Sequence, residues 1–599
     1  FGSVCLFAHN YWLLPFESTK LHKDFTISAT GYYLSDYNCI DNGLKASIMA
    51  IERTVHSPLA TFYKWENAQR NRLYLRQPIN GEWQNYTWGE CGDQVRRMAA
   101  YLKSLNYEPG SRIAILSKNC VHWMLSDFAI WMAGYVSVPM YPNMSPNTVK
   151  QILEHSESKM LFVGKLDDWA YLKPGVPENL PCVAYPFYGI TEYKNWDDII
   201  KNNAPIKENP DYPMQNLCTI MYTSGTTGVP KGVMHTFYNF GFAAEYAFPE
   251  LKVDNTAVFF SYLPMCHIAE RLLIEMGSLY TGGQVSFAES LETFPKNLQE
   301  TSPTLFLAVP RIWSKFQEKI LEKMPQQKLD RLLKIPIVNG IVRKKIKAAL
   351  GLSKAEQCFS GAAPISVDTI NWFWKIGIKI QQAYAMTEDC CYSHTNYIDR
   401  NKVGTVGLRF PHVDVKISEQ GEILIKHPAM MKGYYKEEAQ TKEVFNEEGY
   451  FKTGDKGDVE TEGYLKITGR VKELFKTSKG KYVAPMPIEM KMAANTDIGQ
   501  ALVIGYGLPQ PMVLVTLSEN GKKKSNADVE AGLDKTLKAV NETLDSFEKL
   551  EKVVVMKEEW TIQNNMLTPS LKIKRNEVEK LFQDNYEKWF EMKGDVIWQ

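Results

Sequence analysis

The alternation of two kinds of segment in residues 111–164 most restricts the fold of this chain. Short apolar, β-branched runs alternate with longer runs of helical periodicity. The short runs are 113–116, 136–140 and 160–163, and the longer ones are 120–133 and 148–156. Strands separated by helices pair in parallel, because each helix returns the chain to the same edge of the sheet. We therefore predict an α/β fold with a mostly parallel, helix-covered sheet.

A second set of such segments predicts a second helix-covered sheet. Its expected strands are 257–264, 284–288 and 303–310, and its expected helix is 268–282. From about Val403 the chain changes to close turns and alternating polarity, which predicts a small β-rich subdomain at about 403–470.

The last part of the chain has strand runs and helices of its own, with strands expected at 501–507, 512–518 and 552–558. A chain of 599 residues also exceeds the size at which a single core stops growing. We expect a large N-terminal domain over 49–470 and a smaller α+β C-terminal domain over 471–599.

Composition excludes several classes of protein. Apolar residues make up 44% of the chain and charged residues 23%, as in ordinary globular proteins. The formal net charge of +1 does not fit a nucleic-acid-binding protein. Ten cysteines without a C-x-x-C pair favour reduced thiols in a cytoplasmic protein. No apolar run is long enough to span a bilayer, and peripheral membrane contact stays open.

Residues 1–48 have mixed polarity and no clear periodicity, and the first methionine is Met49. The run SVCLFAHNYWLLPF is only weakly similar to a signal-peptide core, because no basic segment precedes it and His9 and Asn10 interrupt it. We interpret residues 1–48 as an extension of doubtful function. The alternative is an arm that contacts a membrane.

A loop rich in glycine and hydroxyl groups, TSGTTGVPKG, spans residues 223–232. Its glycines let the backbone approach a ligand closely, and successive N–H groups in such a loop form an anion-binding concavity. The spacing differs from the common G-x-x-x-x-G-K-[ST] phosphate loop, because Lys231 is followed by Gly232. The loop predicts a phosphate site of another type, with these candidate residues: Thr223, Ser224, Gly225, Thr226, Thr227, Gly228 and Lys231.

The segment YTSGTTGVPKGV resembles the signature loop of the adenylate-forming superfamily of acyl-CoA synthetases, adenylation domains and luciferases. Further motifs of that family follow in the family's order: LPMCHIAER (263–271), FSGAAPIS (359–366), QQAYAMTED (381–389), GYFKTGDKG (449–457), GYLKITGRVKELFKTSKGKYVAP (463–485) and LTPSLKIKR (567–575). The resemblance covers roughly residues 57–590. The motifs HIAER, VPRIWSKFQEKI and LTPSLKIKR look most like the long-chain fatty-acid branch, including its bubblegum-type members.

The resemblance implies a chemistry that suits these residue types. A carboxylate is a poor electrophile, and its conversion to an acyl adenylate supplies AMP as a leaving group. Catalysis of the attack on the α-phosphate of ATP should depend on positioning and cations. Lys572 would bridge the carboxylate and the α-phosphate, with a solvated lysine as the alternative. Thr387 would donate to the α-phosphate, His267 would lie at the acyl carboxylate, and Glu388 with Thr223 would bind Mg²⁺.

The resemblance also implies a nucleotide site. Asp455 would accept hydrogen bonds from the ribose hydroxyls, and Arg470 would contact the ribose and phosphates. Tyr384 would lie beside the adenine, and the turn of Gly361, Ala362 and Ala363 would let backbone approach the edge of the base. Two positions depart from the family pattern. Ala385 replaces the usual glycine after Tyr384, and Leu571 replaces the usual glycine before the final lysine.

A second step, attack of coenzyme A on the acyl adenylate, is implied as well. The family admits coenzyme A by rotating a mobile C-terminal domain about a hinge, which falls on Lys472 here. The segment 236–248 is expected to be a helix. Phe240, Gly241 and Ala244 on it are candidates for the acyl pocket, and an ordinary buried helix is the alternative.

The function implied is long-chain fatty-acid–CoA ligase activity, with fatty acid, ATP and coenzyme A as substrates and Mg²⁺ as cofactor. One alternative is a fatty-acyl-AMP ligase that passes its product to another acceptor. Another is an inactive lipid or nucleotide sensor. The intact Glu388, Asp455, Arg470 and Lys572 argue against the sensor.

Overall fold

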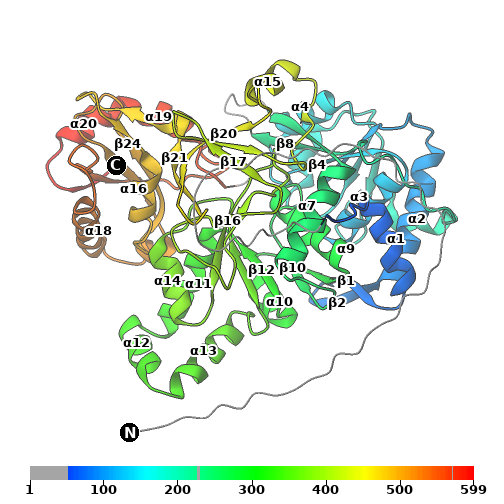
Figure 1. The fold of residues 1–599 in the computed structure, drawn as a ribbon, viewed down its shortest axis with the longest axis horizontal. Coiled ribbons are helices and arrows are strands. Elements are labelled where there is room, and N and C mark those ends of the chain that lie inside the picture. Colours follow the sequence, from blue (N-terminus) through cyan, green and yellow to red (C-terminus); the bar gives the residue numbers. More distant parts are fainter. Residues whose placement is uncertain (1–51, 225–229, 569–570) are drawn as a thin grey trace, which may run out of the picture. The chain divides into compact units, whose positions relative to one another are not determined.

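A computed structural model describes residues 52–224, 230–568 and 571–599 (Figure 1). The predicted extension 1–48 and the loop residues Gly225, Thr226, Thr227 and Gly228 lie outside the described residues. All described residues belong to one contact unit.

The predicted β-α-β-α-β order of residues 111–164 is confirmed. The elements are β3 (Arg112–Leu116), α3 (Val121–Met132), β4 (Val136–Met140), α4 (Pro146–Ser156) and β5 (Met160–Val163). Strand β3 pairs in parallel with both β4 and β5. The residues of β4 and β5 are all buried, which explains their unbroken apolar runs, since helices cover both faces of parallel sheets.

This first sheet has eight strands in the described part of the chain, in the order β19-β9-β8-β4-β3-β5-β6-β7. The other strands are β6 (Cys182–Ala184), β7 (Lys194–Asn195), β8 (Leu217–Ser224), β9 (Pro230–Thr236) and β19 (Gly433–Tyr434). Strands β8 and β9 are antiparallel and flank residues 225–229. The glycine-rich segment therefore connects the two strands of a hairpin at this end of the sheet.

Helix α7 (Phe237–Glu250) begins directly after β9. Thr236 is its N-cap and forms a capping box with Asn239, in which each side chain accepts the other residue's backbone N–H. The helix over 236–248 was predicted. Helix α1 (Pro58–Ala68) packs against α7, α2 (Trp88–Ser104) packs against α3, and α6 (Trp196–Asn202) packs against α2 and β7.

A second sheet has nine strands among the described residues, in the order β16-β15-β14-β13-β12-β10-β11-β1-β2. The strands are β1 (Leu73–Ile79), β2 (Glu82–Thr87), β10 (Val258–Ser261), β11 (Gln284–Phe287), β12 (Leu305–Ala308), β13 (Gln357–Ser360), β14 (Ile380–Tyr384), β15 (His394–Thr395) and β16 (Leu408–Arg409). The pairs from β1 through β11, β10, β12 and β13 to β14 are parallel, as predicted. The edge pairs are antiparallel.

The predicted helix 268–282 is present but not uniform. It runs as α8 (Ile268–Glu270), a π-helical segment Arg271–Met276, and α9 (Gly277–Thr281). Other helices of this part are α10 (Phe294–Thr301), α11 (Pro310–Lys323), α12 (Gln326–Lys334), α13 (Val338–Ala349) and α14 (Val367–Lys375). π segments are rare and often occur at functional sites.

The predicted β-rich part is a four-stranded antiparallel sheet in the described chain, in the order β17-β18-β20-β21. The strands are β17 (Asp414–Ile417), β18 (Glu422–Lys426), β20 (Phe451–Val459) and β21 (Leu465–Arg470). In the register of β20 and β21, Asp455 lies opposite Arg470. Strand pairing thus brings together two predicted site residues that are 15 positions apart in the sequence.

The residues after Arg470 form a further four-stranded sheet in the described chain, shown in orange and red in Figure 1. Its strands are β24 (Ile498–Ile504), β25 (Met512–Leu517), β26 (Val553–Val555) and β27 (Val596–Trp598). Val513 and Val515 belong to one core cluster, and Met512 and Leu514 to another. Alternate side chains of β25 therefore fill opposite faces. The helices are α16 (Pro485–Met492), α18 (Asn526–Asn541), α19 (Arg575–Phe582) and α20 (Tyr586–Glu591).

None of the described helices is long and apolar enough to span a membrane.

Candidate active site

The predicted adenine-contact turn lies at the carboxyl ends of two parallel strands. Strands β13 and β14 pair through Ser360 and Gln382, and the turn at 361–363 follows β13 directly. A Cβ at Gly361 would lie 3.4 Å from the carbonyl oxygen of Ala383. Ala362 has a φ of 65°, in the left-handed region that non-glycine residues rarely adopt. Ligands bind at this edge of open α/β sheets, so the position suits a nucleotide base.

Tyr384, Asp455 and Arg470 form a hydrogen-bonded group. The Tyr384 hydroxyl donates to Asp455 Oδ2 at 2.7 Å, and Arg470 Nε donates to Asp455 Oδ1 at 2.8 Å. Burial and the nearby Asp455 raise the pKa of Tyr384 well above its ordinary value, so its phenol keeps the proton that it donates. Each carboxylate oxygen has a second lone pair, so Asp455 can still accept from a diol.

Tyr434, which the sequence did not indicate as a site residue, fixes the side chain of Glu388. The Tyr434 hydroxyl donates to Glu388 Oε1 at 2.8 Å, and Met431 N donates to the carbonyl oxygen of Glu388 at 2.8 Å. Next to it, His235 Nε2 donates to the carbonyl oxygen of Thr387 at 2.7 Å. Burial lowers the pKa of His235 to about 4, so this donor is a neutral imidazole. Strands β9 and β19 thus fix both predicted catalytic residues.

Lys231 lies at the same tyrosine. Its Nζ is 5.2 Å from the centre of the Tyr434 ring, within the range of a cation–π contact. Thr223 pairs with Lys231 across the hairpin of β8 and β9. The described ends of the glycine-rich loop are therefore next to Glu388. The predicted residue Ser224 ends β8.

Lys572 lies on a tight turn. Leu567 and Ile573 form a β-bridge, Thr568 N donates to the carbonyl oxygen of Lys572 at 2.8 Å, and Lys572 N donates to Thr568 Oγ1 at 3.0 Å. Leu571 has a φ of 64°. That is the conformation which glycine adopts without strain, and glycine is the residue that the family pattern has there. The leucine keeps the turn at a conformational cost.

The charge environment of Lys572 identifies its neighbours. Burial and then the positive charge of Arg470 lower its pKa, while Asp455 and Glu388 act in the opposite direction. Burial and the charge of Lys572 lower the pKa of His267 to about 4. The structure therefore brings the predicted lysine among the other predicted residues. Protein surrounds the Lys572 ammonium group, although the residue keeps contact with solvent, so a ligand can approach it from the solvent.

His267 has a defined tautomer. Ala269 N donates to His267 Nδ1 at 3.2 Å, which makes the histidine the N-cap of α8. A neutral imidazole that accepts at Nδ1 carries its proton on Nε2. His267 Nε2 can therefore donate to a carboxylate, which agrees with the acyl position predicted for it.

A buried carboxyl group holds the segment in front of His267. Glu270 Oε1 accepts from Ser261 Oγ at 2.8 Å, from Tyr262 N at 3.0 Å and from Asn119 Nδ2 at 3.2 Å. Asn119 Oδ1 accepts from Met265 N at 3.0 Å. Burial raises the pKa of Glu270 to about 8, so the carboxyl is largely protonated at neutral pH. The network fixes the loop between β10 and α8.

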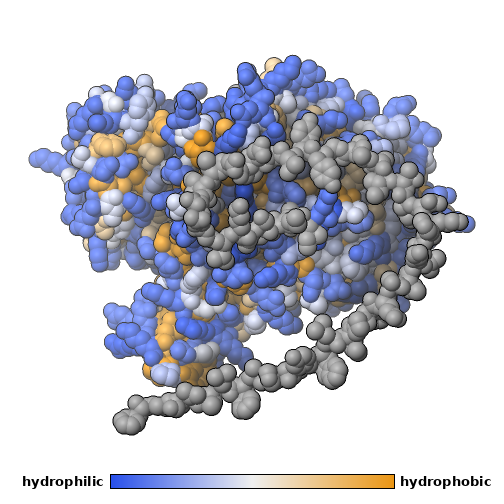
Figure 2. Space-filling model, in the orientation of Figure 1, coloured by the Kyte–Doolittle hydropathy of each residue, from blue (hydrophilic) through white to orange (hydrophobic). Residues whose placement is uncertain are grey.

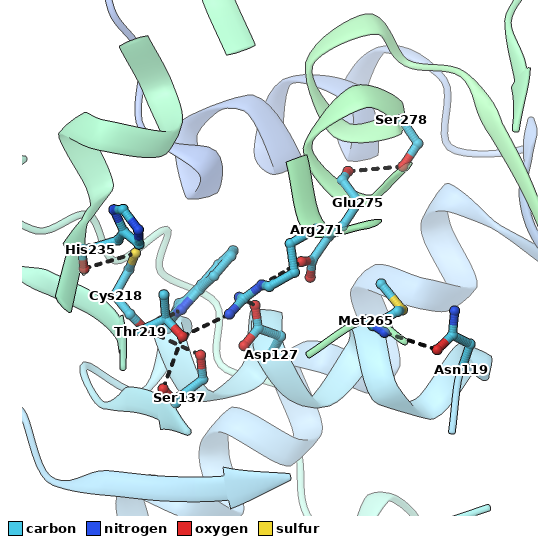
Figure 3. A network of polar contacts seen from close by, with 11 residues as sticks. Asn119, Asp127, Ser137, Cys218, Thr219, His235, Met265, Arg271, Glu275 and Ser278 are labelled. Atoms are coloured by element: carbon cyan, nitrogen blue, oxygen red, sulfur yellow. Dashed lines mark hydrogen bonds and ion pairs between the residues drawn. The ribbon is translucent and has the colours of Figure 1, made fainter. Parts of the chain in front are cut away.

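Arg271 lies at the centre of a fully buried polar network (Figure 3). Its guanidinium donates to Thr219 Oγ1 at 2.7 Å, to Glu275 Oε2 at 3.0 Å and to Asp127 Oδ2. Burial raises the pKa of both carboxyl groups. One carboxylate and one protonated carboxyl would balance the single guanidinium, which avoids a net buried charge. Because Thr219 is on β8, the network joins the π segment to the strand that leads into the glycine-rich loop.

The candidate acyl-pocket residues lie on α7. Phe240 and Ala244 are buried, and the Phe240 ring is 5.3 Å from the Arg271 guanidinium. A Cβ at Gly241 would lie 2.6 Å from the carbonyl oxygen of His56, so the chain at His56 fills the space beside this glycine.

The predicted hinge residue Lys472 is in the 3₁₀ turn Val471–Glu473, directly after β21. The acyl-pocket and hinge assignments both stay predictions.

Sequence reasoning missed several residues of the site: Asn119, His235, Glu270, Arg271 and Tyr434. Glu270 and Arg271 stood inside the quoted motif HIAER, and a buried i, i+4 pair of Arg271 with Glu275 could have been suspected. Tyr434 and His235 carry no spacing signal, since their roles depend on the pairing of β9 with β19.

Comparisons with known proteins find relatives over most of this chain. Residues 62–435 match the protein family described as AMP-binding enzyme, and residues 473–593 match the AMP-binding enzyme C-terminal domain. Among curated proteins, fatty acyl-CoA synthetase B of Dictyostelium discoideum is 28% identical over 86% of this chain and 87% of its own length. The long-chain-fatty-acid–CoA ligase FadD15 of Mycobacterium bovis is 27% identical, covering 88% and 96%. The long-chain-fatty-acid–CoA ligase ACSBG2 of Xenopus laevis is 26% identical, covering 90% and 84%.

Solved structures show the same fold. The adenylation domain of a carboxylate reductase from Mycobacterium chelonae has a TM-score of 0.76 at 21% identity, covering 91% of this chain and 92% of that one. An anthranilate CoA ligase bound to anthranoyl-AMP has a TM-score of 0.74 at 17% identity, covering 89% and 98%.

Proposed function

Because the chain belongs to the family of AMP-binding enzymes, we propose that it is an AMP-forming ligase that joins a long-chain fatty acid to coenzyme A. In the first step a fatty-acid carboxylate oxygen attacks the α-phosphorus of ATP. The bond to the β-phosphate oxygen breaks, and pyrophosphate leaves. In the second step the sulfur of coenzyme A attacks the acyl carbonyl, AMP leaves, and the thiol proton is released.

The observation that supports the first step best is the position of Lys572 in the field of Glu388, Asp455 and Arg470, beside His267. A lysine ammonium there can bridge an incoming carboxylate and the α-phosphate, whose negative charges otherwise repel. His267 Nε2 would hold the carboxylate from the other side. Thr387 would donate to the α-phosphate from a backbone fixed by His235.

The nucleotide would be held by the hydrogen-bonded group of Tyr384, Asp455 and Arg470. Asp455 would accept from the ribose hydroxyls, Arg470 would contact the ribose and phosphates, and Tyr384 would lie beside the adenine. The turn of Gly361, Ala362 and Ala363 would contact the edge of the base. The loop between β8 and β9, including Thr223, Ser224 and Lys231, would hold the departing pyrophosphate.

Magnesium fits the residues present. Glu388 Oε1 accepts from Tyr434, which fixes the carboxylate, and a carboxylate oxygen is a ligand that a hard cation prefers. The described residues contain no group of three or more His, Cys, Asp or Glu side chains suited to a metal. Mg²⁺ bound to nucleotides takes one or two carboxylates and phosphate oxygens, so a single Glu388 with Thr223 is sufficient. Bound Mg²⁺ would neutralise phosphate charge.

The second step needs room for coenzyme A at Lys572. We propose that the part after Arg470 rotates about Lys472, as a C-terminal domain over 471–599, once the adenylate has formed. The eight described cysteines are free thiols, which fits a reducing compartment such as the cytoplasm.

Pyrophosphate release tests this function. The purified chain is incubated with ATP, Mg²⁺ and saturated fatty acids of increasing length, with and without coenzyme A. We expect slow release without coenzyme A, faster turnover and an acyl-CoA product with it, and highest activity on long chains. Adenylate formation without any acyl-CoA product would favour a fatty-acyl-AMP ligase. No release with any acid would contradict enzymatic activity.

A further inference from the structure

Helices α12 and α13 form a hairpin that carries an unusual surface. They pack against each other and project from the strands of the second sheet (Figure 1). Their inner side is ordinary core, since Leu329, Val342 and Ile346 are buried in the second core cluster. Ile335, Ile337 and Ile341 are not members of that cluster.

These isoleucines lie on the outer side of the hairpin and at the connection between the helices. Ile335 is 47% exposed, Ile337 is 82% exposed and Ile341 is 51% exposed. Figure 2 shows hydrophobic side chains between hydrophilic ones over these helices. Scattered single apolar residues are normal on a surface, but grouped exposed ones mark interaction sites.

Ile337 is also held in a strained conformation. Its φ is 69° and its ψ is −51°, and a positive φ is a genuine outlier for a β-branched residue. This backbone places the most exposed of the three isoleucines at the tip between α12 and α13. A strained, exposed apolar side chain is unfavourable in water on two counts, which favours a function for it.

The isoleucines are surrounded by positive charge. Residues 326–349 contain seven Lys and Arg residues and one Asp, a net charge of +6, whereas the whole chain has +1. The basic residues are Lys328, Arg331, Lys334, Arg343, Lys344, Lys345 and Lys347. None of these seven takes part in a salt bridge with another described residue. Arg343 Nε donates to the carbonyl oxygen of Lys375 at 3.1 Å, and the charges of the other six side chains are available to an external partner.

We propose that the hairpin of α12 and α13 is a docking surface for an anionic lipid bilayer. The basic side chains would lie among the negatively charged headgroups, and Ile335, Ile337 and Ile341 would enter the interface. A nucleic acid would pair with the basic side chains but leave the isoleucines in water. The presence of both basic and apolar side chains on this surface therefore favours a lipid bilayer. The surface lies outside the residues proposed for catalysis, and vesicle binding needs no substrate.

Vesicle sedimentation tests the docking surface with the full chain. Vesicles are made of phosphatidylcholine alone or with roughly one third phosphatidylserine. We expect the protein to pellet with the anionic vesicles only, and binding to fall as salt is raised. Ile337→Asn tests the apolar contact, because asparagine has no β-branch and is strained less than isoleucine at this positive φ, so the fold should be kept. Binding should fall about fivefold or more. Lys344→Glu with Lys345→Glu should reduce it by more than about twentyfold.

Matched controls lie elsewhere on the chain. Leu291 is 83% exposed, and Leu291→Asn removes an exposed apolar side chain outside the hairpin. Lys580→Glu with Lys588→Glu makes the same charge change on α19 and α20. Both controls should bind like the wild type. Equal losses in controls and hairpin variants, or equal binding to neutral vesicles, would overturn the proposal. So would binding of a labelled RNA by a protein that does not pellet with either kind of vesicle.

Discussion

The guanidinium of Arg271 donates a hydrogen bond to Thr219 Oγ1 at 2.7 Å, although the two residues are 52 positions apart. Arg271 is the first residue of the π segment, which follows the short helix capped by His267. Thr219 is on the strand that leads into the glycine-rich loop. The proposed acyl-carboxylate contact and the proposed pyrophosphate loop are therefore joined through one buried side chain. Changes at Arg271 should affect both.

Arg271→Met should destabilise the fold strongly. The substitution leaves Asp127 and Glu275 buried without their cation and removes the bond to Thr219. Loss of one partner from a buried ion pair costs about 3–5 kcal/mol of unfolding free energy. The shift of the urea unfolding midpoint measures it. Lys538→Met, which breaks an exposed pair with Asp534, should shift the midpoint far less, because exposed ion pairs contribute little to stability.

A triple variant separates the charge from the packing. Arg271→Met combined with Asp127→Leu and Glu275→Leu replaces the whole network by apolar groups. Buried ion networks replaced in this way are often no less stable. We expect the triple variant to unfold at a higher urea concentration than Arg271→Met alone. A midpoint equal to or lower than that of the single variant would contradict the assignment of the cost to uncompensated charge.

Tyr434→Phe should weaken magnesium dependence without unfolding the site. The substitution removes the hydroxyl that donates to Glu388 and keeps the ring that faces Lys231. Loss of a residue that orients a metal ligand typically reduces metal affinity about 10- to 100-fold. The Mg²⁺ concentration for half-maximal pyrophosphate release measures this. Tyr435→Phe is the control, since Tyr435 contacts His155 and Lys436 through its ring. A shift of equal size in both variants would remove this role from Tyr434.

Lys572→Ala should separate the two steps. The substitution removes the cation that faces the attacking carboxylate and the α-phosphate, so adenylation should fall by about a hundredfold or more. Thioester formation from supplied acyl adenylate and coenzyme A should change by less than about threefold, because that step does not need the ammonium. Lys574→Ala, two residues away, should change neither step. Equal losses in both steps would count against this role of Lys572.

Strands and helices with a strong local pattern were predictable. Strand β4 ends where the sequence placed it, because its apolar run is bounded by turn signals on both sides. The π segment Arg271–Met276 was not predictable, since nothing in local periodicity distinguishes it from an α-helix. Within the site, ordered motifs predicted Asp455 and Arg470, and the structure adds that strand pairing brings them opposite each other. Tyr434 could not be predicted from the sequence, because its contact with Glu388 depends on the pairing of β19 with β9.

Leu571 should be replaceable by glycine but not by isoleucine. With a φ of 64°, the leucine is strained by about 1 kcal/mol, and a β-branched residue would be strained further. Leu571→Gly should retain adenylation within about twofold, since the relief of strain and the added freedom of the unfolded chain act in opposite directions. Leu571→Ile should displace Lys572 and lower the adenylation rate by about fivefold or more. Single-turnover formation of acyl adenylate measures both. Identical rates in the two variants would show that this backbone conformation is not required.

Glu270→Gln should change the pH dependence of stability. In the folded chain burial raises the pKa of Glu270 to about 8, while the unfolded carboxyl has a pKa near 4.5. Between these values the folded state keeps a proton that the unfolded state has released, so the contribution of Glu270 to stability falls as pH rises from 4.5 to 8 and is constant above it. Glutamine keeps the acceptor for Ser261 and Tyr262 but does not titrate. As the pH rises from 5 to 8, the unfolding free energy of the variant should therefore increase relative to that of the wild type. Buried histidines such as His267 are common to both proteins and cancel in the difference. Urea unfolding at intervals across this range measures it, and a difference independent of pH would show that Glu270 is ionised in the folded chain.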